Sequence, residues 1–270
     1  MNPHRLETSL RAARDRGRKL LIPFFTGEYP DRETFRALLL EAQGAGADAL
    51  EVGIPFSDPS ADGPVIQRAS ACALGGGATV RRLLEDLSAV RAQGLTLPVL
   101  FMTYYNPVLA FGPETFARAA REAGADGVLV VDLPPEEAGE FAPAARAEDL
   151  DTVFLVAPTT PEARLPRVLQ GCRGFVYCVS VTGVTGEKRP VAQAVAGMVA
   201  RVRRHTDLPV LAGFGVSGPE AARGLAEVSD GVIVGSALLQ AMGEAFGGKA
   251  MEAAGGFLRS LRAALDAGGS

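Results

Sequence analysis

The 270-residue sequence predicts a (β/α)8 barrel, and a regular series of short apolar runs is the first observation behind this prediction. Each run has about four to seven residues, is rich in Val, Ile, Leu and Phe, and is typical of parallel strands buried on both faces. Most runs begin roughly 22 to 34 residues after the previous one, which is the length that βα units need. Eight occur: LLIPFFT from Leu20, DALEVG from Asp48, LPVLFM from Leu97, DGVLVV from Asp126, TVFLVA from Thr152, GFVYCV from Gly174, LPVLAG from Leu208 and DGVIVG from Asp230.

The segments between the runs have the periodicity of helices, which is the second observation. In ETFRALLLEAQGAGAD, residues Phe35, Leu38 and Leu39 share one face, and Gly44 and Gly46 end the predicted helix. The phrase that joins helix to strand recurs as QGAGADALEVG, REAGADGVLVV and LAEVSDGVIVG. The βα unit is therefore the repeating element, and eight such units over this length favour a closed barrel.

One connection is longer than the rest, because about 49 residues separate the starts of the second and third runs. A doubly wound open sheet is the alternative fold, but it usually carries a dinucleotide-binding loop after its first strand, and FFTGEYP lacks the GxGxxG pattern. We expect residues 1–270 to form a single domain. The N-terminus, MNPHRLETSLRAARDRGRKL, predicts an extra amphipathic helix, since it lacks the apolar centre of a signal peptide and contains Glu7 and Asp15.

Composition excludes several classes of function. The net charge of −4, from 27 basic and 31 acidic residues, argues against nucleic acid and anionic membranes as partners, and no apolar run approaches the ~20 residues of a membrane span. With only His4 and His205, no multi-histidine metal site is expected. The three cysteines, Cys72, Cys172 and Cys178, predict free thiols in a reducing compartment, so we expect a cytoplasmic protein.

The stretch ALEVGIPFSDPSADGP places a carboxylate inside the second predicted strand. Glu51 lies among Leu50, Val52 and Ile54, so we expect it to face the barrel interior; a Glu paired with an Arg or pointing to solvent is the alternative. In barrels of this kind, active sites lie at the C-terminal ends of the strands. Burial there should raise the pKa of Glu51 toward the range that a general acid/base needs near neutral pH.

Two aspartates, Asp58 and Asp62, follow in the enlarged loop. Asp-Pro and Asp-Gly are ordinary turn sequences, so turn formation could explain either residue. For Asp58 the turn and the functional interpretations are balanced. The length of the loop favours function for Asp62, because long ordered barrel loops carry lids and binding residues.

Glycines follow the last three predicted strands, where barrels commonly hold phosphate. Each alone is weak evidence, because glycine also ends strands for steric reasons. Together they allow backbone N–H groups to approach an anion, and the following helix N-termini add a favourable dipole, so they predict a phosphorylated substrate. The residues are Gly183 and Gly186 in VSVTGVTG, Gly213 and Gly215 in GFG, and Gly235 and Ser236 in GSA.

Large apolar residues fall near other strand ends: Phe24, Met102, Leu129, Tyr177 and Phe214. Core filling is the default interpretation of each one. Their convergence on the same mouth as the carboxylates favours a flat apolar part of the substrate.

Two other mechanisms lack the residues they require. A Schiff-base aldolase needs a lysine inside a strand end, and the three lysines, Lys19, Lys188 and Lys249, are not placed there. A metal-dependent aldolase would need a histidine cluster. Acid/base chemistry by carboxylates remains.

The order of motifs resembles the α-subunit family of tryptophan synthase. The matching segments are ALEVGIPFSDPSADGPVIQRAS, YYNPVLAFG, VLVVDLPPEE, SVTGVTG, GFGVS and GSAL. The resemblance as a whole covers the chain from about Leu20 to Leu239. The resemblance implies a (β/α)8 lyase that cleaves indole-3-glycerol phosphate to indole and glyceraldehyde 3-phosphate. It implies Glu51 as the general acid/base and Asp62 as the acceptor of the indole N–H.

The resemblance also implies the remaining site residues and the partner. It implies a β subunit that carries pyridoxal phosphate, in an α2β2 complex, with no cofactor and no metal on this chain. The implied phosphate ligands are Gly186, Gly215, Gly235 and Ser236; the implied indole contacts are Phe24, Leu129, Tyr177, Thr185 and Phe214; the implied interface residues are Pro55, Asp58 and Asn106.

Two positions depart from the family pattern, and two other readings of the function remain. Glu28 stands where a glycine is expected after the first strand, and Ser60 where a larger apolar residue is common. Another phosphate barrel of the same pathway, indole-glycerol-phosphate synthase or phosphoribosylanthranilate isomerase, is one alternative, although the synthase would need a catalytic lysine. A non-catalytic barrel that only docks on a partner is the other, and it would leave Glu51 and Asp62 idle.

Overall fold

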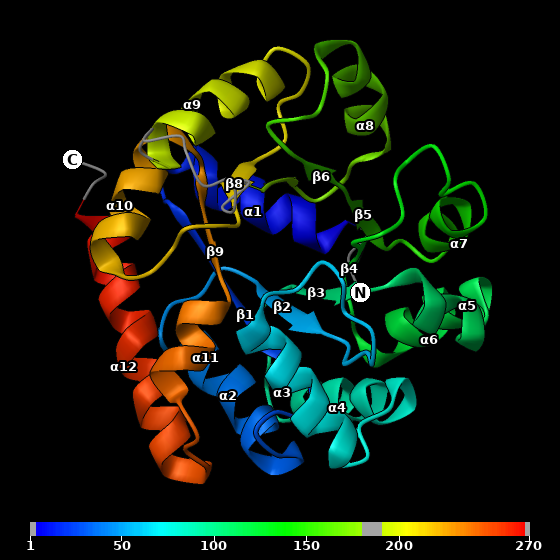
Figure 1. The fold of residues 1–270 in the computed structure, drawn as a ribbon, viewed down its shortest axis with the longest axis vertical. Helices are drawn as coiled ribbons and strands as arrows, with labels where there is room; N and C mark the ends of the chain where they lie inside the picture. Colours follow the sequence, from blue (N-terminus) through cyan, green and yellow to red (C-terminus); the bar gives the residue numbers. More distant parts are fainter. Residues whose placement is uncertain (1–3, 180–190, 268–270) are drawn as a thin grey trace.

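A computed structural model describes residues 4–179 and 191–267 and shows the predicted barrel (Figure 1). In this part of the chain, nine strands form one sheet in the order β5-β4-β3-β2-β1-β9-β8-β7-β6. Strands that are adjacent in this order pair in parallel. The strands are β1 (Leu20–Thr26), β2 (Leu50–Gly53), β3 (Val99–Thr103), β4 (Gly127–Val130), β5 (Asp151–Val153), β6 (Leu155–Val156), β7 (Val176–Cys178), β8 (Val210–Ala212) and β9 (Gly231–Val234).

The fifth barrel strand is divided at a single residue. Phe154 alone separates β5, which pairs with β4, from β6, which pairs with β7. The two short strands therefore occupy one barrel position and close the sheet. Each of the eight predicted apolar runs overlaps an observed strand, and the fifth run overlaps both β5 and β6. The predicted fold class is confirmed.

Helices surround the sheet, as Figure 1 shows. In α2 the predicted apolar face is confirmed, because Phe35, Leu38 and Leu39 are buried, and the Asp31 side chain caps the helix by accepting two backbone N–H bonds. The helices are α1 (Arg5–Asp15), α2 (Arg32–Gly44), α3 (Pro64–Gly75), α4 (Val80–Ala92), α5 (Tyr105–Phe111), α6 (Pro113–Ala123), α7 (Phe141–Ala147), α8 (Leu165–Gly171), α9 (Val191–Val202), α10 (Pro219–Val228), α11 (Ser236–Met242) and α12 (Gly247–Asp266), with a 3-10 turn at Glu162–Arg164.

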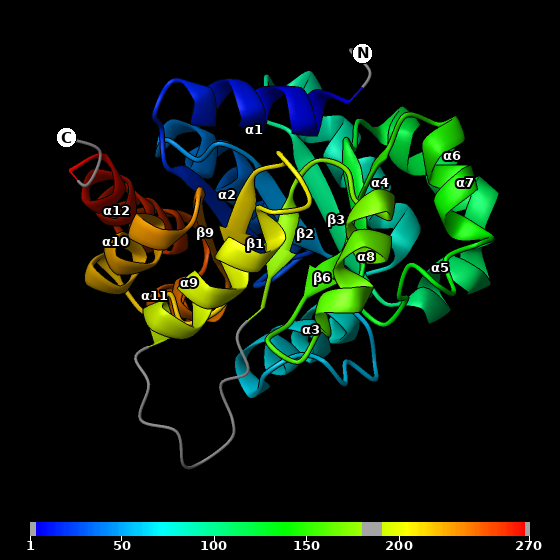
Figure 2. The same cartoon turned by 90° about the horizontal axis from the view of Figure 1, so that it is seen from above.

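The predicted N-terminal helix, α1, covers one end of the barrel. Figure 2 shows it lying across the strands at the end opposite to α3. Leu6 and Leu10 are fully buried and pack with inward-facing strand residues such as Leu20, Ile22 and Leu100. The apolar face of α1 therefore closes the N-terminal end of the barrel, and any ligand must enter from the other end.

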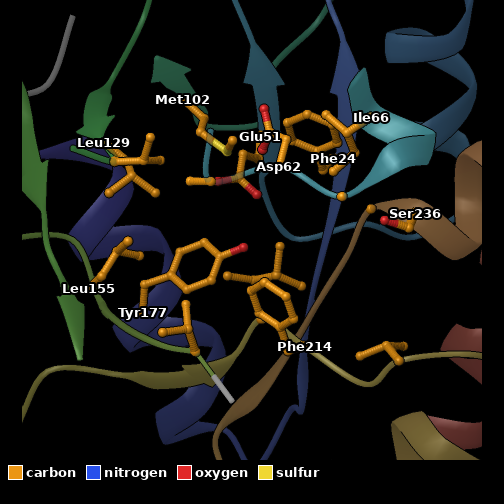
Figure 3. A pocket seen from close by; sticks show the side chains of 18 of the residues that line it. Phe24, Glu51, Asp62, Ile66, Met102, Leu129, Leu155, Tyr177, Phe214 and Ser236 are labelled. Atoms are coloured by element: carbon orange, nitrogen blue, oxygen red, sulfur yellow. The ribbon is translucent and has the colours of Figure 1, made fainter. Parts of the chain in front are cut away.

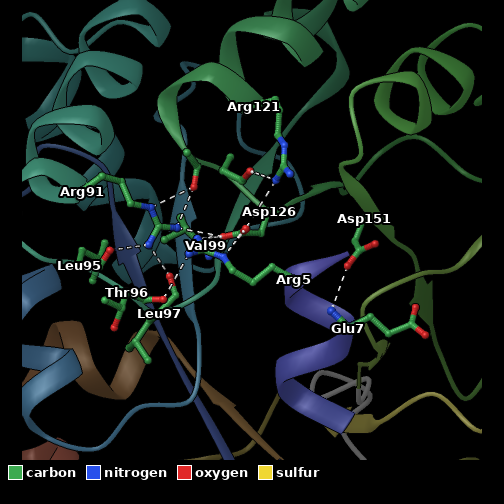
Figure 4. A network of polar contacts seen from close by, with 12 residues as sticks. Arg5, Glu7, Arg91, Leu95, Thr96, Leu97, Val99, Arg121, Asp126 and Asp151 are labelled. Atoms are coloured by element: carbon green, nitrogen blue, oxygen red, sulfur yellow. Dashed lines mark hydrogen bonds and ion pairs between the residues drawn. The ribbon is translucent and has the colours of Figure 1, made fainter. Parts of the chain in front are cut away.

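Aspartates at the starts of several strands organise this closed end. Asp48 accepts a hydrogen bond from the backbone N–H of Leu21 at 2.9 Å, and Asp126 accepts one from Val99 at 2.9 Å. The Asp126 carboxylate also accepts two hydrogen bonds from the Arg5 guanidinium, each of 2.7 Å, and one from Arg91, as Figure 4 shows. The aspartates of the recurring phrase before β2 and β4 therefore join neighbouring strands and helices.

The described residues include no helix that is long and apolar enough to cross a membrane. Within those residues the three cysteines are free, and no cluster of three or more His, Cys, Asp or Glu side chains has the arrangement of a metal site.

Candidate active site

A cavity of about 200 Å³ opens at the C-terminal ends of the strands. Alternate residues of each strand point inward, so every barrel position contributes to its wall (Figure 3). The strand residues that line it are Phe24 of β1, Glu51 of β2, Met102 of β3, Leu129 of β4, Leu155 of β6, Tyr177 of β7 and Ile233 of β9, with Gly213, Phe214, Gly215, Gly235 and Ser236 after β8 and β9.

Glu51 points into this cavity, as expected, and is only 1% exposed. Its carboxylate oxygens form no hydrogen bond of ordinary length with any residue in the described part of the chain. Burial and the charge of Asp62 raise the pKa of Glu51 from its ordinary 4.5 to about 8, and the nearby phenol of Tyr177 opposes this rise. Glu51 is therefore a protonated acid at neutral pH.

Asp62 lies in the loop between β2 and α3, where it is half-buried and lines the same cavity. Its backbone N–H donates to the Pro59 carbonyl at 3.0 Å, and its own carbonyl accepts from the Gln67 side chain at 2.8 Å. Burial raises the pKa of Asp62 from 3.8 to about 6, and the phenol of Tyr104 opposes this rise. At neutral pH the cavity therefore holds one protonated carboxyl group and one largely ionised one, which is the arrangement of an acid/base pair.

Glycines make room for two aromatic rings beside these carboxyl groups. A Cβ atom at Gly213 would lie 1.9 Å from the ring of Tyr177, and one at Gly53 would lie 2.6 Å from the ring of Phe24. Gly235 approaches Phe24 from the other side, where a Cβ would lie at 3.3 Å. The glycine after β8, which the sequence associated with phosphate, thus places the Tyr177 ring next to Glu51.

The backbone after β8 and β9 has the features expected of an anion site. Gly215 has a φ of 81° and lines the cavity with Gly235 and Ser236, which begin α11. The described residues that line the cavity include no Lys, Arg or His side chain, so backbone N–H groups would have to hold a phosphate there. Thr185 and Gly186, two further predicted contacts, lie outside the described residues.

Comparison with known proteins agrees with this geometry, because the family model described as tryptophan synthase alpha chain matches residues 10–259. The chain belongs to this family. It is 46% identical to the tryptophan synthase alpha chain of Geotalea uraniireducens over 98% of this chain and 99% of that one. It is 48% identical to that of Laribacter hongkongensis over 98% and 100% of the two chains.

Solved structures lead to the same family. A tryptophan synthase structure from Mycobacterium tuberculosis superposes with a TM-score of 0.88 at 38% identity, covering 98% of this chain and 99% of that chain. The alpha subunit from Legionella pneumophila gives 0.91 at 36% identity, covering 98% and 100%. Membership of the tryptophan synthase alpha chain family makes this chain a lyase-type enzyme of tryptophan biosynthesis, and it implies a beta-chain partner.

Of the three residues predicted to contact a partner, Pro55 and Asp58 lie in the loop between β2 and α3, and Asn106 lies in the first turn of α5. Pro55, two residues after the end of β2, is buried, whereas Asp58 and Asn106 are exposed. The ring of Phe56, the residue after Pro55, packs against that of Tyr104 with centroids 5.2 Å apart. The exposure of Asp58 and Asn106 leaves both side chains accessible, and the contact with a partner stays a prediction.

Glu28, which departs from the usual family sequence, has an unusual backbone conformation. Its φ is 57°, a left-handed value that favours glycine, and the residue as a whole is 3% exposed. The carboxylate accepts a hydrogen bond from Arg82 at 2.6 Å, and Arg82 also donates to the carbonyls of Gly76 and Gly77. The loop after β1 is therefore tied to the turn between α3 and α4. The second departure, Ser60, is exposed in its loop.

Several wall residues were missed by the sequence analysis. Ile66, Val131, Leu155 and Val179 line the cavity, and strand alternation could have identified Leu155, which lies two residues after the inward-facing Val153. Tyr104 was also missed, because the neighbouring sequence YYNP gives no indication that its hydroxyl meets the Asp62 loop.

Proposed function

We propose that this protein cleaves indole-3-glycerol phosphate to indole and glyceraldehyde 3-phosphate in a retro-aldol reaction. The observation that carries the proposal is that the carboxyl groups of Glu51 and Asp62 line one apolar cavity. Burial raises the pKa of Glu51 to about 8 and that of Asp62 to about 6, which favours a protonated Glu51 beside an ionised Asp62 at neutral pH. Family membership supports the same reaction.

The proposed reaction uses both carboxyl groups, first to form an indolenine and then to break the C–C bond. Glu51 donates its proton to C3 of the indole ring while Asp62 accepts the proton of the ring N–H, which gives an indolenine. The Glu51 carboxylate then takes the proton of the glycerol hydroxyl next to the ring, and the C–C bond breaks as the aldehyde forms. The bond's electron pair returns to the ring, the nitrogen recovers its proton from Asp62, and both groups end in their starting states.

The wall of the cavity suits the two parts of this substrate. We infer that Phe24, Leu129, Tyr177 and Phe214 contact the indole ring, together with Thr185. The phosphate would accept N–H bonds from the glycine-rich backbone and the start of α11, as the flexible φ of glycine permits. The proposed phosphate residues are Gly186, Gly215, Gly235 and Ser236.

We further infer that indole passes to a beta chain in an α2β2 complex, with Pro55, Asp58 and Asn106 at or near the contact. The pyridoxal phosphate of the family is expected on that partner. On this chain, the carboxyl groups of Glu51 and Asp62 perform all the proton transfers proposed here. The expectation of a cytoplasmic enzyme stays a prediction.

Indole release from indole-3-glycerol phosphate, measured with and without a beta chain, tests the proposal. Glu51→Gln should lower the rate by about 10²–10⁴-fold, because the amide cannot exchange a proton. Glu122→Gln is the matched control, since Glu122 is an exposed residue of α6 away from the cavity. A Glu51→Gln enzyme with near-normal rate would refute the role of Glu51, and no release by the unaltered protein would favour another phosphorylated substrate or a docking barrel.

A further inference from the structure

Tyr104 connects the barrel to the loop that carries Asp62. It follows β3, and its side chain is only 3% exposed beneath residues 57–63, which we name the Asp62 loop. Most residues of this loop are exposed. The Tyr104 hydroxyl oxygen accepts the backbone N–H of Ala61 at 2.9 Å. Within the described residues, the loop's other hydrogen bonds stay inside the loop or reach only the first turns of α3.

The aromatic ring of Tyr104 contacts the chain on the other side of the loop. Its centroid lies 5.2 Å from that of Phe56, with the ring planes inclined at 33°. Phe56 precedes the Asp62 loop and Ala61 lies near its end. One buried side chain therefore holds both ends of a loop that has little packing of its own.

The hydroxyl of Tyr104 also acts on Asp62. Because its oxygen accepts from Ala61, its hydrogen remains available to the Asp62 carboxylate, and this interaction lowers the pKa of Asp62 against the effect of burial. Burial, and then the charge of Asp62, raises the pKa of Tyr104, so the phenol stays protonated and remains a donor. The other titratable groups that face the pair are Glu51 of β2, Tyr177 of β7 and Asp132 after β4.

We propose that Tyr104 is a positioning residue of the reaction, which fixes the Asp62 loop over the cavity through Ala61 and keeps the Asp62 carboxylate ionised and aimed at the substrate. This inference rests on the proposed function, because it assumes that Asp62 acts on the indole nitrogen. Tyr104 itself does not line the cavity, so it acts through Asp62.

Two neighbouring tyrosines give a matched pair of variants. Tyr104→Phe keeps the ring that packs on Phe56 and removes only the hydroxyl. Tyr105→Phe is the control, because the hydroxyl of Tyr105 lies 3.4 Å from the exposed Glu140 and takes no part in the Asp62 loop. Both variants are assayed as the full chain with a beta chain, and kcat and KM for indole-3-glycerol phosphate are measured across pH.

Tyr104→Phe should lower kcat by about tenfold or more, as expected for the loss of a hydrogen bond to a charged group, with a smaller change in KM. The acid limb of its kcat/KM profile should move to higher pH, since Asp62 loses a donor that favours its ionised form. Tyr105→Phe should match the unaltered enzyme. A purely structural role of Tyr104 would not move the acid limb.

A double-mutant cycle with Asp62→Asn separates an effect through Asp62 from a general loss of folding. If Tyr104 acts through Asp62, Tyr104→Phe should have little further effect once Asp62 is replaced. An equal loss in both backgrounds would overturn the inference, as would a Tyr104→Phe enzyme with normal kcat and an unmoved acid limb. Absence of indole release by the unaltered enzyme is a different result, because it would refute the proposed function itself.

Discussion

The burial of Glu51 makes the stability of the fold depend on pH with a definite sign. Its pKa is about 8 in the folded protein and 4.5 ordinarily, so the folded state keeps a proton that the unfolded chain releases. Above pH 4.5, rising pH therefore favours the unfolded chain, until Glu51 also ionises in the folded state near pH 8. Each pH unit within this window costs about 1.4 kcal/mol, so the free energy of unfolding should fall by about 3 to 4 kcal/mol between pH 5 and pH 8 from this residue alone.

Glu51→Gln removes the titrating group and therefore isolates this effect. The buried amide carries its own cost, but that cost is the same at every pH. Urea unfolding at several pH values should show the variant gaining on the unaltered protein by about 3 to 4 kcal/mol from pH 5 to pH 8. Glu122→Gln should show no such gain, since Glu122 is exposed. Parallel pH profiles for the two proteins would mean that Glu51 ionises freely in the folded state, and the argument that it is the proton donor would fail.

Three further predictions concern the rate and the closed end of the barrel. The kcat/KM profile should be bell-shaped, rising near pH 6 as the loop aspartate ionises and falling near pH 8 as the strand glutamate loses its proton; a flat profile from pH 5 to 9 would contradict this assignment. Gly213→Ala should displace the Tyr177 ring and lower indole release by about 10²-fold, whereas Gly197→Ala, at an exposed helical position with open space around it, should leave the rate unchanged. Asp126→Asn should lower the free energy of unfolding by about 3 kcal/mol, because Arg5 loses its buried partner. The rate of indole release should stay normal at low temperature, where the variant is folded. A lower rate in the folded variant would show that the two ends of the barrel are coupled.

The strands were predictable because each one is buried on both faces and must be continuously apolar. The division of the fifth strand at Phe154 was not, because the run TVFLVA is unbroken in composition. The N-terminal helix was predicted from its amphipathic pattern, yet the pattern does not say which surface its apolar face covers. Only the folded barrel shows that Leu6 and Leu10 close its end.

The two carboxyl groups were found from the sequence because a charge within an apolar strand is conspicuous and the following loop is long. The contacts that tune them were not, since they join residues far apart in the chain. Gly213 meets the Tyr177 ring, and Tyr104 meets the loop of Asp62, only after the barrel closes. Periodicity predicts which face a residue takes, but it carries no information on such pairs.

Buried carboxyl groups have different partners at the two ends of the barrel. This difference supports the proposed active site more strongly than any single residue does. At the closed end, Asp126 is fully buried and satisfied by two arginines and a backbone N–H, which is how a structural charge is stabilised. At the open end, Glu51 is equally buried, yet the described residues give its oxygens no ordinary hydrogen bond and place no basic side chain in its cavity. A buried carboxyl group that has no basic partner lowers stability when it ionises, so the fold retains it in its neutral form. Glu51 lies at the end of the barrel where a substrate can enter. A role in which Glu51 donates a proton and recovers it best explains why a destabilising carboxyl group is buried there.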